Sequence, residues 1–118
     1  MEVRSREQAE PFTTKDGSTI RVLLDARLGG AVNQSLAEAS LEPGQATQRH
    51  YHARSEELYV LLEGEGDMEV DGERSRVGPG EAILIPPGAW HEIRAGEAPL
   101  RFLCCCAPSY SDEDTFFD

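Results

Sequence analysis

Long apolar runs, secretion signals and helical periodicity are all missing from this sequence of 118 residues. The first residues, MEVRSREQAEPF, contain no apolar region of the secretory type, so no export signal is expected. No apolar run approaches the roughly 20 residues that span a membrane as a helix, and we therefore expect no membrane partner. The length suits one compact domain over residues 1–118.

Basic residues are scarce relative to acidic ones. The chain has 11 Lys and Arg against 22 Asp and Glu, a net charge of −11. Such a chain is repelled by phosphate backbones, so nucleic acid is not an expected partner.

The only cysteines are three consecutive residues, Cys104, Cys105 and Cys106. Neighbouring strand residues point to opposite faces, and an odd, clustered set of this kind indicates free thiols. Free thiols are typical of a reducing compartment, which makes the cytoplasm the expected location.

Short β-rich segments separated by Gly, Pro and Asp-Gly turns fill most of the chain. The expected strands lie at 19–26, 32–41, 45–52, 58–62, 67–70, 74–77, 82–85, 90–93 and 100–106. This pattern indicates an all-β antiparallel sandwich or closed barrel, although residues 35–40 (SLAEAS) taken alone also fit a helical turn. We expect a core over about 32–107, N-terminal strands within 1–31, and an acidic tail at 108–118 that either packs across a subunit boundary or frays.

All three histidines fall in two short segments. His50 and His52 are one residue apart, so on a strand both imidazoles emerge on the same face. Glu57 follows after a turn, and His91 lies on a different strand that closure of the sheet would bring opposite. Three imidazoles and a carboxylate suit a transition metal such as Fe, Mn, Ni, Cu or Zn. Four protein ligands on an octahedral ion leave two positions for water, substrate or dioxygen.

The spacing of these residues resembles the two cupin motifs. The first is matched by Gly44, His50, His52, Glu57 and Gly64, and the second by Gly80, Pro86, Gly88 and His91, with the short intervening segment typical of microbial single-domain cupins. The resemblance implies a jelly-roll-like antiparallel β-barrel. It also implies that His50, His52, Glu57 and His91 bind one divalent transition metal (Fe, Mn, Ni or Zn).

Two features leave alternatives open. The second cupin motif usually ends in Asn, but in this sequence that position is filled by Ala95. The difference concerns the geometry of the local turn more than the binding of a metal. Glu56 is the rival carboxylate, but its spacing to Gly64 fits worse. The competing interpretation of the whole set is surface histidines and a solvated glutamate on a metal-free barrel.

Other positions are interpreted from strand parity. Gln48 shares parity with His50 and Tyr59 with Glu57, so both are candidates to face the lumen and contact a substrate. Tyr59 fits ordinary core packing equally well, and Trp90 is expected to point away from the lumen. A lumenal face of Phe102, Cys104 and Cys106 is expected to hold buried small hydrophobes rather than a catalytic thiol, because no free base accompanies them.

We expect a small metalloenzyme acting on an oxygen-rich or anionic small molecule. Dioxygenase- or lyase-type chemistry is favoured over isomerisation, which needs a free lumenal base. The alternatives are a non-catalytic module that binds or senses a small ligand, and a metal-stabilised interaction domain. A homodimer is expected, with the strand at 19–26 as a candidate edge for pairing.

Overall fold

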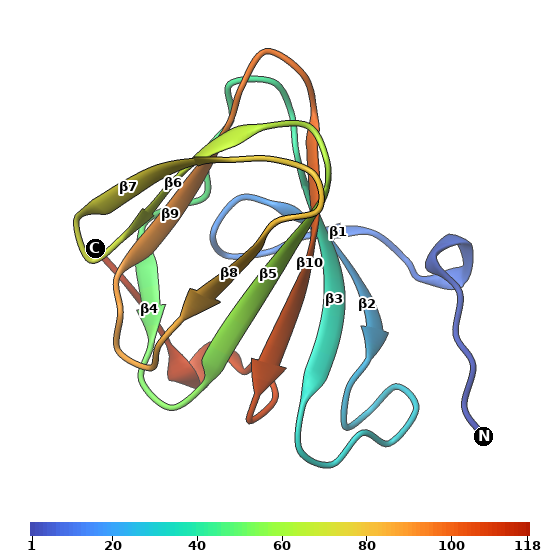
Figure 1. The fold of residues 1–118 in the computed structure, drawn as a ribbon. Helices are drawn as coiled ribbons and strands as arrows, with labels where there is room; N and C mark the ends of the chain where they lie inside the picture. Colours follow the sequence, from blue (N-terminus) through green and yellow to red (C-terminus); the bar gives the residue numbers. More distant parts are fainter.

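The computed structural model describes residues 1–118 as two antiparallel sheets facing one another (Figure 1). The strands are β1 (Phe12–Thr13), β2 (Thr19–Leu24), β3 (Ser35–Leu41), β4 (His50–His52), β5 (Glu56–Glu63), β6 (Gly66–Val70), β7 (Glu73–Val77), β8 (Ala82–Ile85), β9 (His91–Ala95), β10 (Leu100–Ala107) and β11 (Thr115–Phe117). Two short 3-10 turns, η1 (Arg6–Gln8) and η2 (Asp112–Asp114), are the only helical segments. None of the helices is long and apolar enough to serve as a membrane span.

One sheet has the strand order β1-β2-β3-β10-β5-β8, and the other β11-β4-β9-β6-β7. Every pairing between these strands is antiparallel. The predicted all-β, jelly-roll-like fold is confirmed, with one refinement: the strands form two facing sheets rather than one cylinder closed by hydrogen bonds.

Alternation along the strands separates a dry core from a pocket. On β5, Glu57, Tyr59 and Leu61 are buried while Glu56 and Leu58 are exposed. Leu61 belongs to the hydrophobic core between the sheets, and Glu57 lies farther along the same inward row. The core therefore fills one end of the space between the sheets, and the opposite end holds the polar residues described below.

Residues 35–40 lie in strand β3, within the expected strand at 32–41, and the alternative of a helical turn is wrong because Ala39 and Leu41 alternate into the core. The acidic tail does not fray: its last residues form β11, which pairs with β4. Asp114 anchors this tail by accepting hydrogen bonds from the backbone N–H groups of Arg54 (2.9 Å) and Ser55 (3.1 Å).

Strand β1 was also missed by the sequence analysis. It is two residues long, and it pairs Phe12 with Ile20 of β2. The Asp-Gly turn that joins β1 to β2 was predicted, and it packs against the segment before β4, where the N–H of Gln48 donates to the carbonyl oxygen of Asp16 at 2.7 Å.

The glycines of the two motifs have the positive φ angles expected of turn residues. The requirement is strictest at Gly64, because a Cβ atom there would collide with the carbonyl oxygen of Pro99. This close approach joins the β5–β6 turn to the start of β10.

The outer face of the six-stranded sheet carries one buried ion-pair network. Glu38 of β3 is 5% exposed and accepts hydrogen bonds from Arg6 Nε at 2.8 and 2.9 Å and from Arg101 Nη1 at 3.1 Å. Arg6 belongs to η1, so this network holds the N-terminal segment against the sheet.

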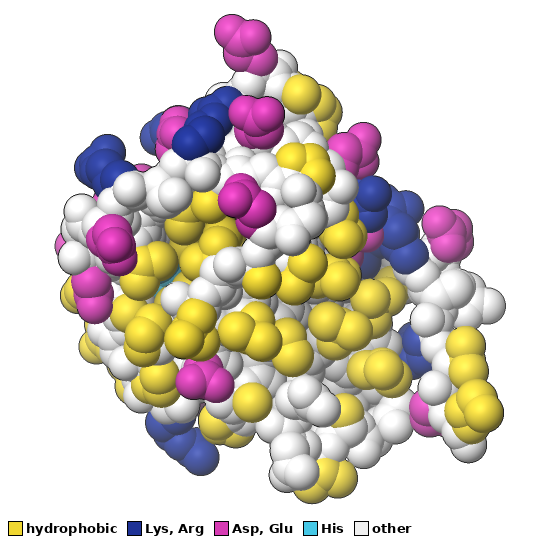
Figure 2. All heavy atoms as spheres, viewed as in Figure 1, with side chains coloured by type: hydrophobic (Ala, Val, Ile, Leu, Met, Phe, Trp, Pro, Cys, Tyr) yellow, Lys and Arg dark blue, Asp and Glu magenta, His cyan; other side chains and the backbone are white.

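The rest of this outer face is largely apolar. Figure 2 shows hydrophobic side chains as a band across it. The strand register places four of them in one cross-strand row: Leu84, Leu58, Cys105 and Leu36.

Candidate metal centre

Three imidazoles meet between the sheets, at the end of the space away from the core. His50 and His91 are direct partners in the β4–β9 pairing, and His52 follows on the same face of β4. All three residues are at most 3% exposed, and one nitrogen from each lies within 4.8 Å of the others. The alternative of surface histidines is therefore wrong.

The hydrogen bonds of the three rings determine which nitrogen holds the proton. His50 Nδ1 lies 2.7 Å from the carbonyl oxygen of Gln48, and His91 Nδ1 lies 3.0 Å from that of Ala89. A carbonyl oxygen only accepts, so in both rings Nδ1–H is the donor. Each Nε2 of the neutral ring then has a free lone pair directed into the cluster, as in histidines that bind metals.

His52 is held in the same tautomer, with the proton on Nδ1, by a hydrogen bond to the hydroxyl group of Thr115. The Thr115 hydroxyl donates to the carbonyl oxygen of Ser111 at 2.8 Å. Its oxygen is thereby left to accept from His52 Nδ1 at 3.1 Å. Strand β11 thus completes the centre by positioning the third imidazole.

Glu57 lies against two of these rings. Its Oε1 is 3.2 Å from His52 Nε2 and 3.4 Å from His91 Nε2, and neither Oε1 nor His91 Nε2 has a hydrogen-bond partner. Burial alone would raise the pKa of Glu57, and hydrogen bonds and charge from His52 and His91 lower it to about 2, which requires a positive charge on the Nε2 side of these rings.

A buried anion facing imidazole lone pairs requires a positive charge between them. Burial, together with the neighbouring His91, also lowers the pKa of His50 to about 4, which disfavours a proton on that ring. The residues present therefore fit a metal cation.

The thiol of Cys106 holds the other oxygen of Glu57. Cys106 Sγ is 3.2 Å from Glu57 Oε2. Burial and the Glu57 charge raise the pKa of Cys106 far above its usual range, so the thiol keeps its proton and donates it to the carboxylate. Burial likewise raises the pKa of Cys104. The predicted inward face of Phe102, Cys104 and Cys106 is confirmed, and neither thiol is an activated nucleophile.

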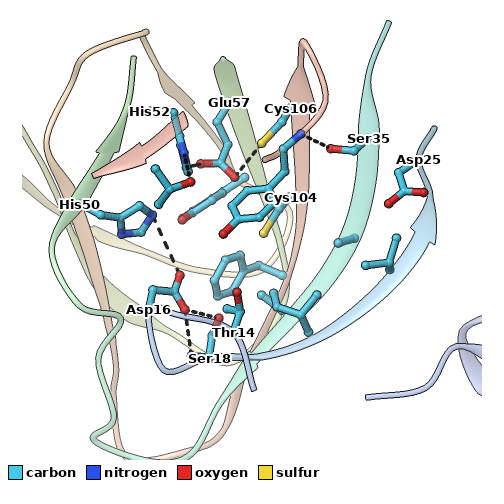
Figure 3. A pocket seen from close by; sticks show the side chains of 18 of the residues that line it. Thr14, Asp16, Ser18, Asp25, Ser35, His50, His52, Glu57, Cys104 and Cys106 are labelled. Atoms are coloured by element: carbon cyan, nitrogen blue, oxygen red, sulfur yellow. Dashed lines mark hydrogen bonds and ion pairs between the residues drawn. The ribbon is translucent and has the colours of Figure 1, made fainter. Parts of the chain in front are cut away.

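A pocket opens beside the imidazoles (Figure 3). It encloses about 750 Å³ of empty space when the solvent at its mouth is included. Apolar and aromatic side chains form most of its wall, among them Ile20, Val22, Phe102 and Phe117. No Lys or Arg lines it, whereas Asp16, Asp25 and Glu57 do.

The two residues proposed to contact a substrate have different positions. Tyr59 lines the pocket, packs on Phe102 with ring centroids 4.6 Å apart, and stays protonated at neutral pH because burial and then Glu57 raise its pKa. Gln48 is exposed and does not line the pocket, so the expectation that it faces the lumen is wrong. Strand β4 begins only at His50. Gln48 lies in the irregular segment before it, where side chains do not alternate between the two faces of the sheet.

Trp90 points away from the pocket, as expected. The centroid of its ring lies 4.6 Å from that of Tyr51, on the outer face of β4. Arg49 Cζ lies over the Trp90 ring, 4.8 Å from its centroid. The residue has a packing role on the exterior.

Two polar residues at the centre were not predicted as site residues. Thr115 carried no signal in the sequence, because its contact with His52 depends on a three-residue strand in the tail. Asp16 was interpreted only as a turn residue, although its carboxylate faces His50 (Figure 3).

Comparison with known proteins gives related chains over nearly the full length. The uncharacterized protein MJ1618 of Methanocaldococcus jannaschii is 47% identical over 110 residues, which cover 92% of this chain and 88% of that protein. The tetracenomycin polyketide synthase protein TcmJ of Streptomyces glaucescens is 32% identical over 80% of this chain and 64% of its own length. The chain thus spans slightly less than two thirds of TcmJ.

A solved structure supports the same relationship. The polyketide cyclase RemF of Streptomyces resistomycificus superposes with a TM-score of 0.81 at 28% identity, covering 97% of this chain and 89% of RemF. The family pattern described as "Cupin domain" matches residues 37–106, which include both histidine segments and Glu57. Fold, sequence pattern and relatives agree, and the chain belongs to the cupin family.

Proposed function

We propose that this cupin is a metal-dependent enzyme whose single divalent transition metal is held by His50, His52, Glu57 and His91. The observation that carries the proposal is the shared orientation of the three rings: every Nδ1 is occupied by an acceptor outside the cluster, and every Nε2 faces inward. The metal would act as a Lewis acid that polarises an oxygen of the bound molecule.

The pocket wall favours a molecule with neutral oxygen donors and an apolar or aromatic body. Binding of a carboxylate or phosphate normally uses an Arg or Lys, and the pocket offers neither. The similarity to a polyketide cyclase and to a polyketide synthase protein is consistent with an oxygenated, polyketide-like or phenolic compound. This narrows the initial expectation, which included anionic molecules.

Within this chain, Tyr59 would donate a hydrogen bond to the bound molecule, and the apolar wall would exclude water from it. All the imidazoles are committed as ligands, so no free histidine is available to move a proton between substrate carbons. We therefore favour dioxygenase- or lyase-type chemistry over isomerisation.

Metal analysis followed by turnover assays tests the proposal. Protein purified without a histidine tag should contain about one metal per chain, and oxygen uptake or product formation should follow with a panel of phenols and 1,3-diketones. His91→Ala should abolish both, whereas Glu92→Gln, which changes the neighbouring residue pointing out of the pocket, should keep both. A metal-free protein that shows no dependence on His91 would refute the proposal.

A non-catalytic binding module is the second candidate. It is favoured by the scarcity of uncommitted acid–base groups in the pocket. This candidate predicts that a ligand stabilises the metal-bound protein and is recovered unchanged under aerobic and anaerobic conditions.

We also propose that two copies associate in a reducing compartment such as the cytoplasm. The row formed by Leu84, Leu58, Cys105 and Leu36 is present on each copy, and Leu84 is 56% exposed. A twofold contact would cover both rows at once. Light scattering should give twice the chain mass of 13.0 kDa, and Leu84→Arg should give the monomer mass. A wild-type protein of single-chain mass would refute the dimer.

A further inference from the structure

A second carboxylate lies at the centre, outside the predicted set of ligands. Asp16 belongs to the turn between β1 and β2, and its Oδ2 is 4.0 Å from His50 Nε2. The side chain is 15% exposed and faces the histidine across the pocket (Figure 3). The turn therefore brings a charge to the one imidazole for which no contact with Glu57 is seen.

The Asp16 side chain is held in this orientation by its own turn. Its Oδ1 accepts hydrogen bonds from the Ser18 N–H at 2.9 Å and the Ser18 hydroxyl at 2.6 Å. The other oxygen, Oδ2, makes no hydrogen bond within the chain and is directed at His50.

The turn is also tied to the segment that carries His50. The backbone N–H of Gln48 donates to the carbonyl oxygen of Asp16 at 2.7 Å, and Gln45 Nε2 donates to that of Gly17 at 2.8 Å. Gly17 has a φ of +94°, which a residue with a side chain rarely adopts. Asp16 and His50 are therefore positioned by one connected unit, although they are distant in sequence.

The separation of Asp16 from His50 is compatible with a shared ion. Two donors that each lie about 2.1 Å from one metal are at most about 4.2 Å apart, and Asp16 Oδ2 and His50 Nε2 are 4.0 Å apart. The donors that lie within 4.8 Å of one another are those of His50, His52 and His91, so Asp16 would have to move toward the other two imidazoles to share their ion. Glu57 contacts His52 and His91, whereas Asp16 contacts His50. The two carboxylates thus approach the cluster beside different imidazoles.

We propose that Asp16 is a second carboxylate ligand of the metal centre, an inference that rests on the metal site proposed above. Two carboxylates would balance the charge of a divalent ion and favour metals that accept oxygen donors, such as Mn(II) and Fe(II). With five protein ligands, an octahedral ion has one open position, so a substrate would bind through a single oxygen. A neutral centre would also attract small anions less than a cationic one.

Asp16→Asn is the sharpest test, because the Asn carbonyl oxygen can still accept from Ser18 and preserve the turn. We expect the affinity for Mn²⁺, measured by calorimetry, to fall by about 10- to 100-fold. The visible spectrum of the Co²⁺ form should change, and azide should bind it more tightly than it binds the wild type. Asp25→Asn removes the pocket carboxylate that lies away from the histidines in Figure 3 and should leave metal affinity unchanged.

The outcomes separate this inference from the proposed function. If His91→Ala abolishes metal binding while Asp16→Asn matches the wild type in Mn²⁺ affinity and Co²⁺ spectrum, Asp16 is not a ligand and the four-residue centre stands. If His91→Ala binds Mn²⁺ like the wild type, the centre itself fails. Should Asp16→Asn not fold, Asp16→Glu keeps the charge, and its Co²⁺ spectrum should differ from that of the wild type; an identical spectrum would overturn the inference.

Discussion

The role of the C-terminal strand can be tested by removing one hydroxyl. Thr115→Val keeps the size and β-branching of the side chain, so the pairing of β11 with β4 should persist. The change removes the acceptor for His52 Nδ1–H at 3.1 Å and the donor to Ser111 at 2.8 Å. The ring of His52 is then free to rotate or to shift its proton to Nε2.

Loss of such an outer contact to a metal-binding histidine typically lowers metal affinity by about 10- to 100-fold, or about 1.4–2.7 kcal/mol. The same change should lower the stability of the metal-free protein by about 1–3 kcal/mol, because the buried Nδ1–H loses its partner and the Ser111 carbonyl keeps only the Asp114 N–H at 3.2 Å. Competition with a chelator measures the first quantity and urea denaturation the second. Thr115→Ser retains the hydroxyl and should restore most of both.

The reasoning would be refuted by a Thr115→Val protein that binds Mn²⁺ within twofold of the wild type. That result would mean that the hydrogen bond to Thr115 does not position His52. A variant that loses stability but keeps its metal affinity would assign Thr115 a packing role only.

Three further predictions follow from particular contacts. Cys106→Val removes the thiol that donates to Glu57 at 3.2 Å and should weaken Mn²⁺ binding several-fold in calorimetry, whereas Cys106→Ser should not. Glu38→Gln should lower the free energy of unfolding by about 2 kcal/mol, because Arg6 and Arg101 lose their buried anion. Glu63→Gln removes a carboxylate that is 67% exposed and should change this free energy little. Equal effects of the two substitutions would contradict a stabilising role of the buried ion pairs of Glu38. Burial lowers the pKa of His50 from 6.5 to about 4, so as the pH falls the unfolded chain binds a proton at this residue before the folded protein does. The free energy of unfolding of the metal-free protein should therefore fall by about 2–3 kcal/mol between pH 7 and 4.5 through this group. An equal fall in the His50→Gln variant would contradict this.

The sequence predicted the fold and the position of the histidines because both depend on period-two alternation. His50 and His52 fall on one face of a short strand, and Tyr59 shares the inward row of Glu57, as parity requires. The same logic failed at Gln48, because residues before β4 are irregular and Thr47 turns inward instead.

Contacts that join distant segments could not be predicted in this way. Asp16 meets His50 only after the β1–β2 turn packs on the segment before β4, and the strong turn signal of Asp-Gly gave no indication that its carboxylate faces a histidine. Thr115 meets His52 only through the pairing of β11 with β4. Both depend on tertiary packing, which leaves no periodicity in the sequence.

X-ray absorption spectroscopy of the metal-loaded protein tests the central claim most directly, because it counts imidazole and oxygen donors around the ion. We predict three imidazole nitrogens and at least one carboxylate oxygen in the wild type, and two imidazoles in His52→Ala. A wild-type spectrum with one imidazole or none would contradict the assignment of His50, His52 and His91 as ligands.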